Sequence, residues 1–117
     1  MNIEEYRSFC LQLKGVEEDL PFDNNTLVYK VMGKMFCAFG LSEFTRINLK
    51  CEPEKSLELR ETYKGIKPGF HMNKKHWNSI YLDEDVPWKV VLDLTKHSYD
   101  LVANSLTKKL KEELKSR

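Results

Sequence analysis

Apolar residues recur at helical spacing near both ends of the chain. The first such run predicts a helix over residues 2–14, ended by Gly15, with a stripe of Ile3, Tyr6, Cys10 and Leu13. The last predicts a helix over residues 87–104, with a stripe of Trp88, Val91, Leu92, Thr95, Tyr99, Val102 and Leu106. Between them, Pro53 stands at a position that suits the first turn of a helix, with Leu57 and Leu59 predicted on its core face.

The segments between these helices show the alternation that is typical of strands. Strands are predicted over residues 26–31, 35–39, 46–51 and 79–82, with Gly33-Lys34 as a hairpin turn between the first two. The alternation is clearest over residues 46–51, with Ile47, Leu49 and Cys51 on one side and Arg46, Asn48 and Lys50 on the other. Residues 16–25 are interpreted as an acidic connector.

The predicted order is helix, three strands, helix, two strands, helix. Each helix has one apolar stripe and the strand links are short, so the economical arrangement is two layers, with helices on one face of a mainly antiparallel sheet. We therefore expect an α+β two-layer sandwich, α-β(3)-α-β(2)-α, in one domain over residues 1–117. Whether residues 107–117 continue the last helix or form a short basic helix stays open.

Charge is unevenly distributed, although the net charge is only +1. Residues 1–23 carry six acidic and two basic side chains, whereas residues 64–77 carry four lysines and no acid. Residues 69–78, which overlap this basic segment, also hold two histidines, a tryptophan and a phenylalanine. They are predicted to form a basic, aromatic turn that leads into a strand. These features predict one acidic end and one basic side.

The outer sheet face is predicted to be cationic. If Ile47 and Ile80 point at the helices, the residues that point away include Arg46, Lys50 and Tyr81, with Lys30 joining from the first strand. The turn would border this face with Lys74, Lys75, His76 and Trp77. Cations with interleaved aromatic rings suit a phosphate backbone and its bases. The alternative is that these lysines only keep the face soluble and protect sheet edges.

No catalytic or metal-binding constellation is found. His71 and His76 are five residues apart, which places them off the same helix face and on opposite faces of a strand, and no cysteine pair accompanies them. The three cysteines, Cys10, Cys37 and Cys51, lie in apolar or periodic runs and are interpreted as buried, reduced thiols. We expect a cytoplasmic protein with no cofactor, no metal and no enzymatic activity.

Several segments together resemble the MmcQ/YjbR family of small bacterial proteins. The most specific is Pro68-Gly69-Phe70-His71-Met72-Asn73-Lys74-Lys75-His76-Trp77-Asn78. The others are Gly15-Val16, Leu20-Pro21-Phe22-Asp23, Val31-Met32-Gly33-Lys34-Met35-Phe36, Arg46-Ile47-Asn48-Leu49-Lys50-Cys51 and His97-Ser98-Tyr99-Asp100-Leu101-Val102. The resemblance covers nearly the whole chain and implies an α-β(3)-α-β(2)-α two-layer fold.

The resemblance also implies a function. Members of the family look like "double-wing" proteins and are commonly described as DNA-binding by analogy of fold. The expected nucleic-acid-binding residues are Arg46, Lys50, Lys74, Lys75, His76, Trp77 and Tyr81. The same architecture resembles secretion chaperones, so a peptide- or protein-binding module is the alternative. The oligomeric state stays open.

Overall fold

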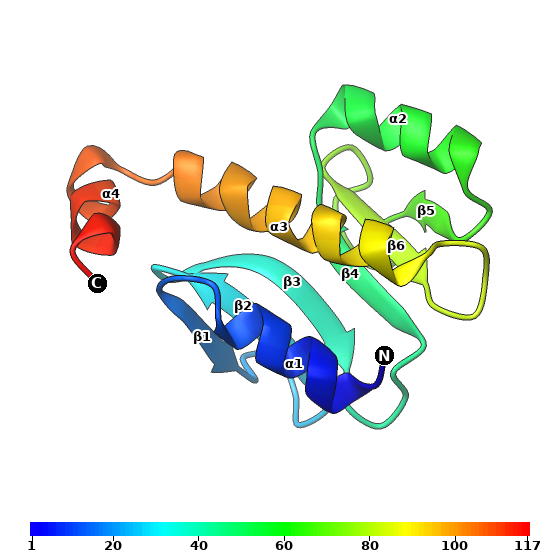
Figure 1. The fold of residues 1–117 in the computed structure, drawn as a ribbon, viewed down its shortest axis with the longest axis horizontal. Coiled ribbons are helices and arrows are strands. Elements are labelled where there is room, and N and C mark those ends of the chain that lie inside the picture. The colour runs from blue at the N-terminus through cyan, green and yellow to red at the C-terminus, as the bar shows by residue number, and fades with distance from the viewer.

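The computed structural model describes all 117 residues and has four helices and one open, six-stranded antiparallel sheet (Figure 1). The helices are α1 (Ile3–Leu11), α2 (Pro53–Thr62), α3 (Trp88–Asn104) and α4 (Lys108–Lys115). The strands are β1 (Val16–Asp19), β2 (Thr26–Val31), β3 (Lys34–Gly40), β4 (Arg46–Lys50), β5 (Ile66–Pro68) and β6 (Trp77–Tyr81). The sheet order is β1-β2-β3-β4-β6-β5. The predicted α+β class and antiparallel sheet are confirmed.

The core lies between the sheet and helices α1 and α3, which both lie in front of the strands in Figure 1. Ile47 of β4 pairs with Ile80 of β6, and both are almost completely buried in this core. Tyr6 of α1 packs edge-on against Phe39 of β3. Each fully buried apolar side chain of this size contributes about 1.5–3 kcal/mol through the hydrophobic effect. The predicted inward register of β4 and β6 is therefore confirmed.

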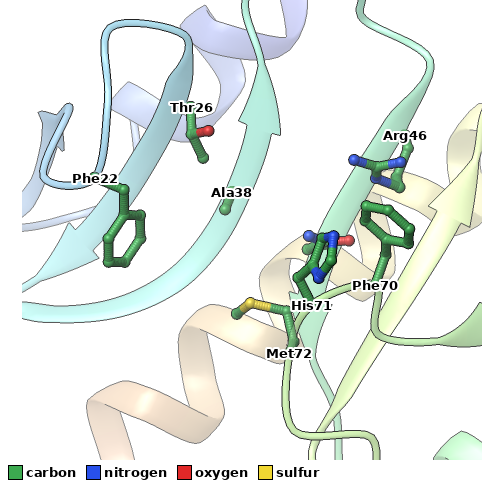
Figure 2. Close-up of a pocket in the computed structure, with 8 residues that line it drawn as sticks. Phe22, Thr26, Ala38, Arg46, Phe70, His71 and Met72 are labelled. Atoms are coloured by element: carbon green, nitrogen blue, oxygen red, sulfur yellow. The ribbon is translucent and has the colours of Figure 1, made fainter.

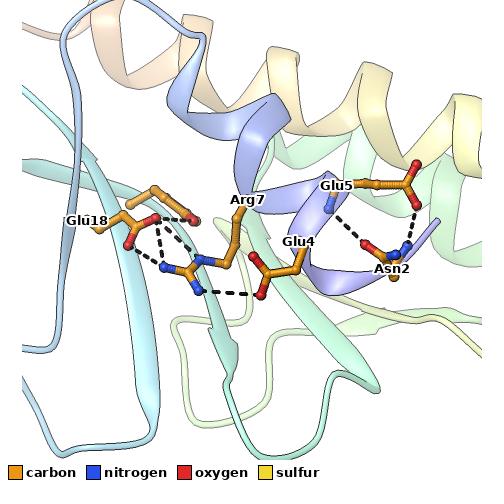
Figure 3. Close-up of polar contacts among 6 residues, drawn as sticks. Asn2, Glu4, Glu5, Arg7 and Glu18 are labelled. Carbon is orange, nitrogen blue, oxygen red and sulfur yellow. Dashed lines mark hydrogen bonds and ion pairs between the residues drawn. The ribbon is translucent and has the colours of Figure 1, made fainter.

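The interpretation of residues 16–25 as a connector is wrong over its first part, because Val16–Asp19 forms strand β1. β1 pairs antiparallel with β2, and the carboxylate of Glu18 on β1 contacts the guanidinium of Arg7 on α1 (Figure 3). Glu18 accepts hydrogen bonds from Arg7 Nη2 at 2.9 Å and from Tyr29 Oη at 3.0 Å. Each of these contacts joins two different elements, so the periodicity within one element could not reveal them.

Two further local predictions need correction. The hairpin between β2 and β3 turns at Met32-Gly33 rather than Gly33-Lys34, because both Met32 and Gly33 adopt positive φ, as the mirror-image turn requires. On α2, Leu57 is 61% exposed instead of buried, and the buried residue is Ser56. The Ser56 hydroxyl accepts a hydrogen bond from Asn78 of β6, so α2 meets the sheet partly through polar contacts.

The buried stripe of α3 differs from the predicted one. Leu92 is only half-buried, whereas Leu94 and Ser98 are buried and were not predicted. The Ser98 hydroxyl accepts a hydrogen bond from the backbone N–H of Lys50 at 2.9 Å and donates to the carbonyl of Phe36. These backbone groups lie just beyond the β3–β4 ladder, so a polar side chain is required where the sequence pattern favoured an apolar one.

The C-terminal segment forms a separate helix. The hydroxyl of Thr107 caps α4, so α3 ends before it. Leu114 of α4 lies against Gly15, where a Cβ atom would come within 2.5 Å of its Cδ1. Gly15 also has a positive φ of 74°, so two independent constraints favour glycine there.

The three cysteines are buried and free, as predicted. Burial raises the pKa of the Cys37 and Cys51 thiols. No helix combines the length and the apolar character that crossing a membrane would need.

Candidate functional site

The sheet face opposite the helices, called the open face below, carries the outward residues of β4 and β6. On β4 these are Arg46, Asn48 and Lys50, all half-buried, which alternate with the core residues. Arg46 pairs with Tyr81 and Lys50 with Trp77 across the ladder. Residues that pair directly lie on the same face of a sheet. The structure therefore places four of the seven predicted binding residues on the same side of the sheet, with Trp77 buried there.

Strand β5 adds a cation that was not predicted. Lys67 pairs with Ser79 of β6, which places its exposed side chain on the open face. No acidic residue occurs between residues 64 and 82 or within β4. None of Arg46, Lys50 and Lys67 takes part in the four ion pairs of the structure. This part of the open face is thus cationic without internal neutralisation.

The opposite end of the open face is neutralised. Lys30 of β2 points outward as predicted, but its Nζ lies 2.9 Å from Oδ2 of Asp19 on β1. Both side chains are partly exposed. Lys30 therefore forms an ion pair with β1, the strand that the sequence analysis missed. The cationic side chains that form no ion pair concentrate over β4, β6 and β5.

Residues 69–76 form a loop, called the basic loop, that links β5 to β6. The carboxamide oxygen of Asn73 accepts hydrogen bonds from the backbone N–H groups of Lys75 and His76. Lys74 Nζ donates to the carbonyl of Gly69 at 2.9 Å and so braces the loop. Lys74, Lys75 and His76 are all exposed. The Lys74 carbonyl accepts a hydrogen bond from Arg60 of α2, so this end of the loop lies at the edge where α2 meets the sheet.

The predicted placement of Trp77 at an exposed tip is wrong. Trp77 begins β6 and is only 8% exposed. The chain folds back over it at Gly69, whose N–H donates to the Trp77 carbonyl at 2.8 Å. A Cβ atom on Gly69 would lie 2.8 Å from Cβ of Trp77, so this close approach requires glycine. The Trp77 ring is therefore unavailable for stacking on a ligand.

Phe70 supplies the exposed aromatic ring that was expected of Trp77. It is 43% exposed, and its ring lies under the guanidinium of Arg46, with 4.1 Å from Cζ to the ring centroid. The Phe70 backbone N–H donates to the Ser79 hydroxyl at 2.8 Å, which anchors the loop on the open face. A cation thus lies directly against an exposed π face.

A pocket of about 320 Å³ opens beside this pair (Figure 2). Its lining consists of Phe22, Thr26, Ala38, Arg46, Asn48, Phe70, His71 and Met72. Figure 2 shows Phe22 and Phe70 on opposite sides of Ala38, which forms part of the floor on β3. No lining residue is acidic. The pocket combines exposed phenylalanine rings with an imidazole, a guanidinium, a carboxamide and a hydroxyl.

Most of the pocket residues escaped the sequence analysis. Phe22 and Phe70 lie in loops, where no periodicity marks their direction, yet both belong to segments that carry the family resemblance. Phe22 is 67% exposed, which is unusual for a large apolar side chain without a partner. Ala38 gave one local signal, because it is the small residue in a strand of larger ones. Their convergence depends on the tertiary fold.

Titratable groups elsewhere have structural partners. His97 Nε2 accepts a hydrogen bond from the backbone N–H of Glu52 at 3.4 Å, and burial lowers the pKa of His97. The Tyr6 hydroxyl lies 2.8 Å from Thr95 Oγ1 in the core, where burial raises its pKa. The structure contains no cluster of three or more His, Cys, Asp or Glu side chains suited to a metal ion.

The fold is that of a small α+β protein with one open, antiparallel sheet. The family model described as YjbR matches residues 11–101, which is most of the chain. The chain therefore belongs to the YjbR family, and the family resemblance seen in the sequence is confirmed.

Proteins of this family from several bacteria are similar to the chain. The uncharacterized protein YbdF of Escherichia coli O157:H7 is 40% identical over 107 residues, which cover 91% of this chain and 88% of YbdF. The uncharacterized protein YjbR of Escherichia coli K12 is 29% identical, with 91% of each chain covered. The crystal structure of Deinococcus radiodurans protein DR2400, which carries the DUF419 domain, superposes with a TM-score of 0.89 at 38% identity, covering 97% of this chain and 87% of that one.

Proposed function

We propose that this protein binds nucleic acid, without catalysing a reaction, through the open face of β4, β6 and β5 and the adjoining basic loop. The observation that carries the proposal is the unneutralised set Arg46, Lys50 and Lys67 beside the exposed ring of Phe70. Lys74 and Lys75 extend the cationic surface along the loop. Cations neutralise phosphates, and aromatic rings stack on bases.

The low net charge is compatible with this function because the cations are segregated. Six acids lie within residues 1–23, and those of β1 belong to the opposite end of the sheet. A phosphate backbone laid across β4, β6 and β5 would meet lysine and arginine side chains without facing a carboxylate from those strands. Binding that depends mainly on phosphate contacts has a dissociation constant of about 10⁻⁴–10⁻⁶ M at physiological salt.

The test is a fluorescence-anisotropy titration of labelled single- and double-stranded oligonucleotides at several salt concentrations. We expect affinity to fall as salt rises, with the log–log slope reduced by about 0.7 for each single-strand phosphate contact removed. The variants are Lys74→Ala/Lys75→Ala and Lys50→Ala/Lys67→Ala. The matched control is Lys108→Ala/Lys109→Ala on α4, which removes the same charge away from the open face.

Two outcomes would reject nucleic-acid binding through this face. One is the absence of binding even at low salt. The other is an equal loss in the α4 control and in the open-face variants, which would show an effect of total charge alone.

The second candidate is a peptide- or protein-binding module. It is favoured by the apolar part of the pocket lining, namely Phe22, Ala38, Phe70 and Met72. Exposed aromatic and methionine side chains are typical of surfaces that accept apolar anchors. Such binding would change little with salt, whereas phosphate binding would change steeply. The same titration series, repeated with a peptide that bears apolar anchor residues, separates the two functions.

A further inference from the structure

A pocket lies at the edge of the cationic surface. Phosphate binding alone would require neither a pocket of this size nor its aromatic lining. Its volume of about 320 Å³ is at the lower end of the range for small-molecule sites, so it suits one ring system and its sugar rather than a long chain. Its residues come from the loop before β2, from β2, β3 and β4, and from the basic loop. The pocket therefore draws its lining from five segments of the chain.

The walls present flat apolar surfaces. Phe22 and Phe70 are the two most exposed phenylalanines of the chain and stand on opposite sides of the pocket floor, and the His71 ring lies on the floor side of Phe70, with 4.1 Å between the two ring centroids (Figure 2). Arg46 lies against the Phe70 ring as well, so the planar groups that border the floor are the rings of Phe22 and His71, with the guanidinium beside them. Planar apolar groups beside a guanidinium attract planar, electron-rich rings in preference to aliphatic chains.

The floor offers a polar group that can contact the edge of such a ring. The Asn48 carboxamide oxygen accepts a hydrogen bond from the Ser79 hydroxyl, so its orientation is set by β6. Its NH₂ group forms no hydrogen bond within the protein and remains available as a donor in the pocket lining. Carbonyl oxygens and ring nitrogens on base edges are acceptors for such a donor.

The charge of the pocket matches a ligand that carries phosphate. Arg46 belongs both to the lining and to the cationic surface of β4, so a ligand in the pocket would continue onto that surface. The acid nearest in sequence to Phe22 is Asp23, whose carboxylate accepts hydrogen bonds from the N–H groups of Asn25 and Thr26. These hydrogen bonds lower its pKa and hold the carboxylate on its own turn.

We propose that the pocket binds one unpaired nucleobase, while Arg46 and the lysines of the open face bind the flanking phosphates. This inference rests on the proposed nucleic-acid binding and adds the form of the ligand: single-stranded, or with an extruded base. A base within a duplex has both faces covered by its neighbours and cannot enter a pocket without leaving the stack. The protein therefore discriminates by base accessibility.

The test compares three labelled probes with the wild-type protein at low salt. They are an oligothymidylate of 12 nucleotides, a strand of the same length in which every nucleotide lacks its base, and the duplex of the oligothymidylate with oligoadenylate. We expect the oligothymidylate to bind about 10-fold or more tightly than the abasic strand. This ratio is within the range of affinity losses that follow removal of one base–aromatic stacking contact. The duplex, despite its higher charge density, gains nothing from the pocket.

Equal affinity for the oligothymidylate and the abasic strand would overturn the pocket assignment and leave phosphate binding in place. Tighter binding of the duplex than of the single strand would overturn it as well. Failure of all three probes to bind would instead reject the proposed function, and the pocket assignment with it. The two hypotheses therefore fail in distinguishable ways.

Variants locate the effect in the pocket. Ala38→Leu adds volume to the floor without changing charge, and should abolish the preference for oligothymidylate while leaving affinity for the abasic strand unchanged. Phe22→Ala, at a largely exposed position, tests the same point if the first variant does not fold. Leu57→Ala on α2 is the matched control for an exposed apolar side chain away from the pocket. A preference retained by both pocket variants would overturn the proposal.

Discussion

The guanidinium carbon of Arg46 lies 4.1 Å from the centroid of the Phe70 ring, which joins the middle of the sheet to the loop that borders it. Arg46 is fixed on β4 by the ladder to β6, and Phe70 lies in the basic loop, where its backbone N–H donates to the Ser79 hydroxyl. Together with the Phe70–Ser79 hydrogen bond, the pair holds the start of the loop over the open face and keeps one cation at the pocket edge.

We expect this pair to contribute measurably to stability. Arg46→Ala and Phe70→Ala, alone and together, form a double-mutant cycle whose coupling free energy should be about 0.5–1 kcal/mol, the scale of a partly exposed cation–π contact. Urea denaturation provides the unfolding free energies. Strict additivity of the two changes would show that the contact contributes no net energy.

Leu94 and Leu92 of α3 should differ in their sensitivity to truncation. Leu94 is 6% exposed, so Leu94→Ala should reduce the free energy of unfolding by about 2–5 kcal/mol. Leu92 is half-buried beside Phe9 and Leu13, so Leu92→Ala should cost clearly less. Both follow from one set of urea curves. A larger loss of stability for Leu92→Ala than for Leu94→Ala would contradict the face of α3 that the structure turns toward the sheet.

The three thiols should resist modification in the folded protein. Cys10, Cys37 and Cys51 are buried, and burial raises the pKa of Cys37 and Cys51, which lowers the thiolate fraction at any given pH. A disulfide reagent at pH 8 should label them slowly in the native state and all at once in denaturant. Rapid native labelling of all three would contradict the burial.

Stability should decrease on acidification because of His97. Its pKa is lowered by burial and by Lys55, against the opposing effect of Glu52 and Asp100. A histidine with a lowered folded-state pKa favours folding in its neutral form, so its contribution is present above the unfolded pKa of about 6.5 and is lost as pH falls through the folded pKa.

The control for that effect is His97→Gln, which has no titrating group. Its free energy of unfolding should decline less steeply between pH 7 and pH 5 than that of the wild-type protein, as measured by urea denaturation at several pH values. Parallel curves for the two proteins would assign the acid sensitivity to other groups.

Local pattern was sufficient for the secondary structure wherever one face of an element is buried against a uniform apolar layer. The alternation of Arg46–Cys51 placed Ile47 and Leu49 inward and Arg46 and Lys50 outward, because side chains alternate strictly along a strand. The cationic character of the open face followed from the same alternation. The class of fold followed from the number of apolar stripes and the short links.

Only the tertiary structure decided which of these outward residues form a site. β1 pairs with β2, where Glu18 contacts Arg7 and Tyr29, and Asp19 of the same strand neutralises Lys30 at the opposite end of the face. Trp77 is buried because Gly69 permits the chain to fold back over it. Phe22, Ala38 and Phe70 line one pocket although they are far apart in sequence. Periodicity records the direction of a side chain relative to its own element, whereas these contacts depend on where distant elements meet.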